Sequence, residues 1–154
     1  MAGRTDVRLA EAKVCEIVGT SQQQRRQLVG RDLLRAAPAG GCTLRDALEL
    51  AALVELQSHL EARAARVAWG QLKPQLAELV PGARLDIVFD IRLGRIQLAR
   101  SDAELAKAVR ARSPVQVVEL GPRLQEVGDA FRRWAEVAPF RPLQRGRHRD
   151  QRSA

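Results

Sequence analysis

Residues 22 to 26 carry three amide side chains followed by two guanidinium groups: Gln22, Gln23, Gln24, Arg25 and Arg26. A glutamine amide can pair with adenine through two hydrogen bonds, and an arginine fork can donate two parallel bonds to guanine. Side chains of these types on one helix face suit the edges of bases in a DNA major groove. An ordinary solvated helix face is the alternative interpretation.

A helix–turn–helix arrangement is predicted to position this run. A first helix is expected over residues 9–18, and Gly19 suits its C-terminal cap because that position needs a positive φ. Ser21 is a candidate N-cap for the second helix, since its hydroxyl can accept from an orphan amide. The five polar residues would then lie on the second helix.

A glycine-rich turn and a long helix are predicted next. Pro38-Ala39-Gly40-Gly41 indicates a turn whose flanking residues could pair as a small hairpin, or wing. Thr43 is a candidate N-cap for a third helix, which the apolar pattern extends from Leu44 to about Ala68.

The C-terminal half alternates between strand-like and helix-like segments. Residues 85–91 and 95–98 flank Arg92-Leu93-Gly94 and predict a β-hairpin. A capping-box pattern at Ser101 and Glu104 opens a helix that ends near residue 112. A strand over 114–120 and a helix over 122–137 follow, and a short helix over 73–79 precedes them.

The predicted fold class is therefore α+β. It comprises an N-terminal winged helix–turn–helix head, a long connecting helix, and a small C-terminal module of β-hairpin, helix, strand and helix. We expect the head with its connecting helix over residues 1–70, a dimerisation or effector module over 71–138, and a flexible basic tail over 139–154.

The stretch over residues 19–34 resembles the MerR family of winged-helix DNA-binding proteins. That family's run Gly-Val-Ser-x-x-Thr-Leu-Arg-Tyr-Tyr-Glu-x-x-Gly-Leu-Leu lies without a gap on this stretch. It matches at Gly19, Ser21, Arg26, Leu33 and Leu34.

Further likeness and some departures accompany this match. Residues 40–46 resemble the family's wing and the start of its third helix, and the likeness as a whole covers roughly residues 8–60, a third of the chain. Gln27 and Leu28 replace its paired tyrosines, Val29 its acidic residue, and Arg25 one of its apolar residues.

The resemblance implies a set of DNA contacts. It implies that Gln22, Gln23 and Arg26 face the groove, and that Arg31, Arg35 and Thr43 approach phosphates from the turn and the wing. The complete set of candidate DNA-binding residues is Ser21, Gln22, Gln23, Arg25, Arg26, Arg31, Arg35, Thr43 and Arg45. The resemblance also implies a homodimer formed through residues 57–67.

Charge supports a polyanionic partner. The formal net charge is +8, and residues 1–42 hold seven basic groups against four acidic ones. Residues 139–154 hold five arginines against Asp150 alone. A basic head and tail around a nearly balanced middle fit double-stranded DNA contacted at the ends, although a GC-rich coding bias could also favour arginine.

Other chemistries are not indicated. Asp86 and Asp90 fit a solvated strand face, and His59 and His148 lack ligand partners at metal-binding spacing. No catalytic, cofactor or metal site is therefore expected. No apolar run is long enough to span a membrane, and no signal peptide opens the chain, so we expect a cytoplasmic protein with reduced cysteines.

Three functional classes follow from these features. The first is a sequence-specific, dimeric transcription regulator whose residues 71–138 bind a ligand, a second copy, or a protein such as RNA polymerase. The second is a DNA-binding antitoxin whose C-terminal half binds its toxin, since the order of elements loosely resembles such proteins. The third is an architectural protein that binds DNA with little sequence preference.

Overall fold

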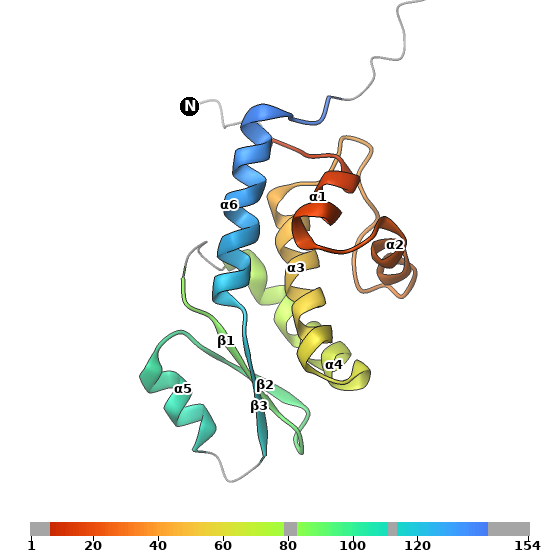
Figure 1. Cartoon of the computed structure of the whole chain (residues 1–154). Helices are drawn as coiled ribbons and strands as arrows, with labels where there is room; N and C mark the ends of the chain where they lie inside the picture. Colours follow the sequence, from red (N-terminus) through yellow and green to blue (C-terminus); the bar gives the residue numbers. More distant parts are fainter. Residues whose placement is uncertain (1–6, 79–82, 111–113, 142–154) are drawn as a thin grey trace, which may run out of the picture.

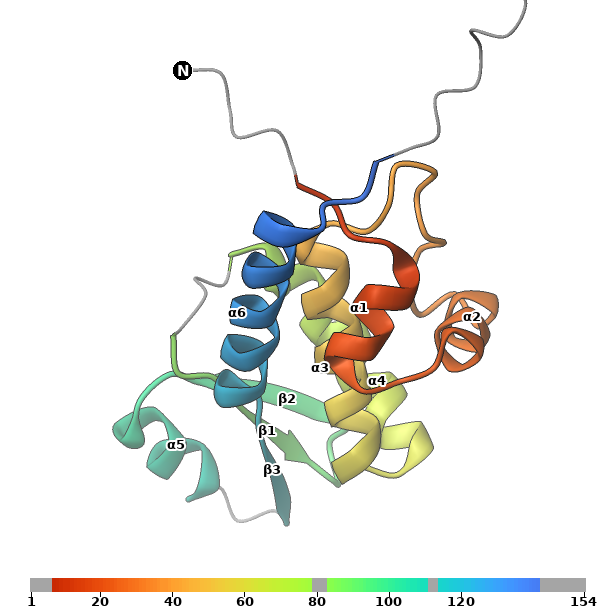
Figure 2. The same cartoon turned by 45° about the horizontal axis from the view of Figure 1, so that its top comes forward.

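The N-terminal half is helical, as the apolar periodicity predicts. The structure, a computed structural model, describes residues 7–78, 83–110 and 114–141. In the first of these ranges lie α1 (Glu11–Val18), α2 (Gln22–Gly30), α3 (Leu44–His59), α4 (Ala62–Leu72) and a 3-10 helix (Lys73–Glu78). Figures 1 and 2 show α2 at the periphery of the molecule, with α1 and α3 on its inner side.

The prediction of one helix from residue 44 to residue 68 is wrong. Leu60 and Glu61 are extended, with ψ near 150° and 159°, and they separate α3 from α4. The break lets Leu60 enter the core, and it turns α4 so that Ala65, Ala68 and Trp69 pack inward. A continuous apolar pattern could not reveal this change of direction.

The expected wing hairpin is also not formed. Gly41 closes a turn by donating its N–H to the carbonyl of Pro38 at 2.9 Å, but the flanking residues do not pair with each other. Instead Cys42 bridges to Leu9, with N···O distances of 2.9 and 2.7 Å. Gly41 has φ +92°, and a Cβ there would lie 2.9 Å from the carbonyl oxygen of Leu9. The loop is therefore fixed to the N-terminal arm.

The C-terminal half has the predicted order of hairpin, helix, strand and helix, and the α+β class is confirmed. Its elements are β1 (Asp86–Asp90), β2 (Arg95–Ala99), α5 (Asp102–Val109), β3 (Val115–Glu119) and α6 (Gly121–Val137). The sheet is antiparallel with the order β2-β1-β3. Asp86 pairs with Ala99 on one side and with Glu119 on the other.

The two faces of the sheet are buried by different helices. Ile87, Phe89 and Val118 join the main core beneath the N-terminal helices. Val88 and Ala99 form a smaller cluster on the opposite face, covered by α5. Alternate strand residues therefore serve two separate cores.

The main core continues across residue 70, where the sequence suggests a module boundary. Helix α6 runs beside α3 and also contacts α1, and its Val127 and Phe131 belong to the same cluster as Leu50 and Leu53 (Figure 1). Arg123 of α6 donates a hydrogen bond to the carbonyl of Val18. The N-terminal helices are thus packed against the last helix of the chain.

Neither a membrane-spanning helix nor a metal-binding cluster occurs among the described residues. Among residues 7–78, 83–110 and 114–141, no helix combines the length and the hydropathy needed to cross a membrane. The same residues bring together no group of three or more His, Cys, Asp or Glu side chains that could hold a metal ion. Most of the basic tail expected over 139–154 lies outside the described residues.

Candidate nucleic-acid interface

Helix α2 begins with a capping box. Ser21 Oγ accepts from the Gln24 N–H at 3.0 Å, and Gln24 Oε1 accepts from the Ser21 N–H at 3.1 Å. Gly19 ends α1 with φ +83° and directs the chain into this cap. The predicted N-cap is confirmed, and the Ser21 hydroxyl is engaged in starting the helix.

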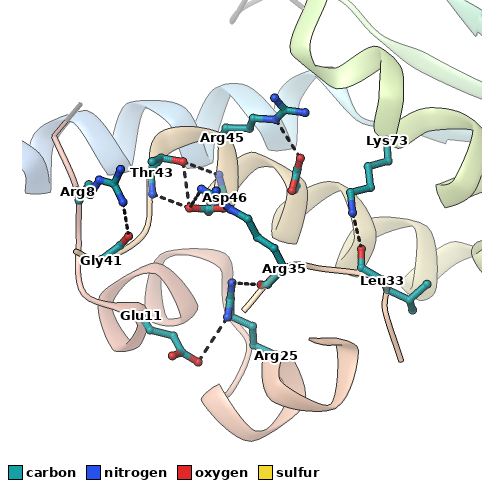
Figure 3. Close-up of polar contacts among 11 residues, drawn as sticks. Arg8, Glu11, Arg25, Leu33, Arg35, Gly41, Thr43, Arg45, Asp46 and Lys73 are labelled. Atoms are coloured by element: carbon teal, nitrogen blue, oxygen red, sulfur yellow. Dashed lines mark hydrogen bonds and ion pairs between the residues drawn. The ribbon is translucent and has the colours of Figure 1, made fainter. Parts of the chain in front are cut away.

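The inner side of α2 is held by Arg25 and Leu28, which are both buried. Arg25 is 2% exposed, donates through Nη2 to the carbonyl of Arg35 at 3.0 Å, and lies 3.7 Å from Glu11 Oε1 (Figure 3). The expectation that Arg25 contacts DNA is at odds with this position, because the whole side chain is buried, with Nη2 bonded internally and Nε without a hydrogen-bond partner among the described residues. Arg25 instead joins α2 to α1 and to the loop that follows α2.

Gln22, Gln23 and Arg26 point away from the protein and form what we call the outer face of α2. All three are exposed, and the Arg26 side chain is 70% exposed. Arg26 Nε forms a long ion pair with Glu11 Oε1 at 3.8 Å, beyond hydrogen-bond distance, so the Arg26 N–H groups can still donate to a ligand. This face therefore presents unused donors and acceptors on a fixed helix.

Three predicted DNA-binding residues around the start of α3, Arg35, Thr43 and Arg45, already have partners within the protein. Arg35 holds Asp46 with two bonds, Nε to Oδ1 at 2.6 Å and Nη2 to Oδ2 at 2.8 Å (Figure 3). Arg45 Nε donates to Glu49 Oε1 at 3.1 Å. Thr43 caps α3, because its hydroxyl accepts from the Asp46 N–H at 3.2 Å.

The carboxylate of Asp46 is the centre of this network. Burial alone would raise its pKa, but hydrogen bonds from Arg35 and from the backbone and hydroxyl of Thr43 outweigh burial and lower the pKa below its ordinary value. Asp46 is therefore ionised at neutral pH, and it offsets the charge of Arg35.

The predicted DNA-binding residues other than Ser21 and Arg25 lie in three separate places. Arg35, Thr43 and Arg45 line a groove of about 790 Å³ between α3 and α6, together with Arg8 and Arg132. The carboxylates of Asp46, Glu49 and Glu136 nearly balance these arginines. Arg31 lies elsewhere, in a hollow between α2 and the end of α3, and the outer face of α2 lines neither.

A polar stripe that runs along α2 and just beyond its ends was not identified from the sequence. Gln24 and Gln27 of α2, with Thr20 before its N-cap and Arg31 at its C-cap, line a hollow of about 340 Å³ with Gln57 of α3. Gln24, Gln27 and Arg31 are spaced by three and four residues, as on one side of a helix, so this signal was present in the sequence. Gln27 and Arg31 extend the exposed donors beside the outer face of α2.

The two cysteines take no part in this surface. Cys15 and Cys42 are free and buried. Burial raises the pKa of the Cys15 thiol, and it raises the pKa of Cys42 to about 11. Both thiols are therefore protonated at neutral pH.

No protein-family model matches this chain, and no curated protein resembles it closely enough to count as a relative. The functional assignment consequently depends on the geometry described above.

Proposed function

We propose that this chain is a sequence-specific DNA-binding transcription regulator, and that α2 is its recognition helix. The observation that carries the proposal is the outer face of α2. There Gln22, Gln23 and Arg26 stand exposed, while the other side of the helix is anchored by Arg25 and Leu28. A fixed helix with free amide and guanidinium groups meets the geometric requirement for reading base edges.

The backbone and burial of α2 support a MerR-like head. The MerR run has apolar or aromatic residues at the positions of Arg25 and Leu28, and both are buried here. It has glycine at the position of Asp32, and Asp32 has φ +58°, a conformation that glycine adopts most easily. The burial of Arg25 and Leu28 and the positive φ of Asp32 are therefore the observations that support a MerR-like head.

The proposal assigns different roles to the exposed side chains. Gln22, Gln23 and Arg26 read bases, and Arg31 beside them contacts a phosphate. Arg35 and Arg45 can reach a phosphate only through the N–H groups that Asp46 and Glu49 leave free. We assign no catalytic, cofactor or metal role.

We extend the proposal to a dimer that is paired through β3. The break at Leu60 interrupts the helix over 57–67 that would have formed a dimer seam. Strand β3 is an edge strand. Along its ladder with β1 every second residue is hydrogen-bonded to β1, from Leu120, which bonds to Leu85, to Pro114, which bonds to Ile91. Val115, Val117 and Glu119 therefore direct their backbone groups outward, where a second copy of β3 could pair.

An antitoxin that binds DNA through α2 and a toxin through its C-terminal half is the second candidate. It is favoured by the exposed apolar side chains of Ile91 and Leu93 at the hairpin tip, which would suit a protein partner. Both candidates share α2 as the DNA reader.

Selection of duplexes from a random pool tests the proposal. We expect enrichment of one sequence, which binds the full chain at least a hundredfold more tightly than a shuffled duplex at physiological salt. Equal affinity for both duplexes, falling in parallel with log salt, would instead indicate an architectural protein that binds through charge alone. No binding to either duplex would exclude the DNA-binding proposal.

A further inference from the structure

A second surface lies at the opposite half of the molecule, where the β1–β2 hairpin tip meets α4. A hollow of about 580 Å³ opens there between the helix and the sheet. We call it the hairpin hollow; its lining includes Arg63, Val67, Phe89, Ile91, Arg92 and Leu93. None of these residues belongs to the candidate nucleic-acid interface.

Apolar side chains are unusually exposed at this site. Leu93 is 65% exposed and Ile91 50% exposed, and Val67 on α4 is also exposed. Hairpin turns are normally built from Gly, Asn, Asp and Ser, so two large aliphatic residues serve no need of the turn itself. Apolar patches with polar rims mark sites where another molecule binds.

The backbone beneath these side chains is fixed. Asp90 Oδ1 accepts from the N–H groups of Arg92 and Leu93, both at 2.9 Å. Gln71 of α4 donates to the Gly94 carbonyl and accepts from the Ile96 N–H, both at 2.8 Å. The hairpin tip is therefore preorganised, and a ligand would find Ile91 and Leu93 already in place.

The rim of the hollow is basic. Arg63 and Arg92 line it, and neither forms an ion pair with any residue in the described part of the chain. Glu61 is the one acidic residue in the lining. Apolar side chains beside two free guanidinium groups complement a ligand that offers apolar groups and carboxylates.

We infer that the hairpin hollow binds an acidic, amphipathic segment of a partner protein. Leucine, isoleucine or phenylalanine side chains of that segment cover Val67, Ile91 and Leu93, and its Asp or Glu residues pair with Arg63 and Arg92. The surface contains no residue of α2, and this inference does not depend on the DNA-binding proposal.

A displayed library of random 16-residue peptides tests the inference on the full chain, with counter-selection on Leu93→Ser. We expect selected peptides to be rich in Asp or Glu and in large aliphatic or aromatic residues. Fluorescence anisotropy of the best peptide should show binding at least tenfold weaker to Leu93→Ser and to Arg92→Glu. Val109→Ser at the end of α5 and Arg110→Glu at its C-cap are matched controls outside the hollow, and they should bind within twofold of the wild type.

Charge reversal separates a specific contact from loss of folding. A peptide with Lys in place of its acidic residues should bind the wild type weakly and regain affinity for an Arg63→Glu/Arg92→Glu variant. Failure to enrich any acidic peptide, or equal binding to Leu93→Ser, would overturn the inference. Two other results would also overturn it. If the wild type binds phosphatidylserine vesicles and Leu93→Ser does not, the occupant is a membrane. If the wild type self-associates in sedimentation and Leu93→Ser does not, the occupant is a second copy of the chain.

Discussion

Arg25 shows how one residue can serve the interior although its type suggests the surface. Its guanidinium links α2 to the carbonyl of Arg35 and to the carboxylate of Glu11, and its side chain is buried among the head helices. A buried charge needs partners of this kind, because desolvation would otherwise disfavour it. Arg25 therefore positions the outer face of α2 without belonging to it.

Replacing Arg25 by methionine should destabilise the fold. Arg25→Met removes the bond to Arg35 and leaves Glu11 without its buried counter-charge, so we expect a loss of about 1–3 kcal/mol in the free energy of unfolding. Urea denaturation measures this loss, and Arg26→Met on the exposed side should change it by less than about 0.5 kcal/mol. Equal losses in both variants would contradict the anchoring role of Arg25.

The buried thiol of Cys42 predicts a loss of stability in alkaline solution. Its folded pKa of about 11 is above the ordinary thiol value of about 8.5, so its contribution is complete below pH 8.5 and disappears as pH rises towards 11. We expect the unfolding free energy to fall by about 1–3 kcal/mol over this range. Cys42→Ala should show a smaller fall in parallel titrations, and an identical fall would refute the prediction.

The sequence indicated which residue types could bind DNA, but not which of those side chains are exposed. Gln22, Gln23 and Arg26 are exposed as predicted, because helical spacing puts them opposite Leu28. Arg25 could not be distinguished from Arg26 by type alone. Its burial depends on the carbonyl of Arg35, a tertiary contact made ten residues away.

The two helices that bound the loop over residues 31–43 both start with capping boxes, but the boxes differ in charge. Ser21 and Gln24 form a neutral, exposed pair at α2. At α3, Thr43 is half-buried and Asp46 is buried, and Arg35 forms an ion pair with the Asp46 carboxylate. The start of α3 is therefore the one whose stability depends on ionisation.

Acid should weaken the α3 cap. Asp46 has a folded pKa below its ordinary value, so its stabilising contribution is present above about pH 4 and is lost as pH falls through the folded pKa. Asp46→Asn should lower stability at pH 7 and flatten the decline in the acid range below about pH 4. Unfolding curves recorded across this interval provide the measurement. A decline as steep as that of the wild type would show that Asp46 is not the titrating group.

The sequence predicted helices and strands correctly where local signals determine them, and it missed the features that tertiary contacts determine. Glycine at 19, the N-cap residues Ser21, Thr43 and Ser101, and the alternation over 85–98 identified helix ends and the hairpin correctly. The break at Leu60 and the Leu9–Cys42 bridge were missed. Both depend on how the chain returns to a shared core, which periodicity within one segment does not encode.

The whole molecule is organised around α6, which joins the C-terminal half to the head helices. Phe131 lies in the main core, Lys13 of α1 stacks over Trp134 at 3.7 Å from the ring centroid, and Arg123 reaches Val18. Helix α6 therefore ties the C-terminal half of the chain to α1 and α3.

The proposed dimer should be sensitive to charge at the outer edge of β3. Val117 is 45% exposed, and antiparallel pairing centred on it would place two copies of a Val117→Asp variant opposite each other. Like charges in that position destabilise strand pairing, so sedimentation should show monomer at concentrations where the wild type is dimeric. Val109→Asp on α5 is the control and should remain dimeric. A dimeric Val117→Asp variant would exclude pairing through β3.

Base-specific binding energies test whether the outer face of α2 reads base pairs. Affinity should be measured for the wild type and for Arg26→Ala against the selected duplex and each of its single base-pair variants. We predict that Arg26→Ala weakens binding roughly 5- to 150-fold and becomes indifferent to one base pair that the wild type requires. The exposed Arg66→Ala control on α4 should keep the full preference. If Arg26→Ala, Gln22→Ala and Gln23→Ala all bind every duplex as the wild type does, α2 is not the recognition helix.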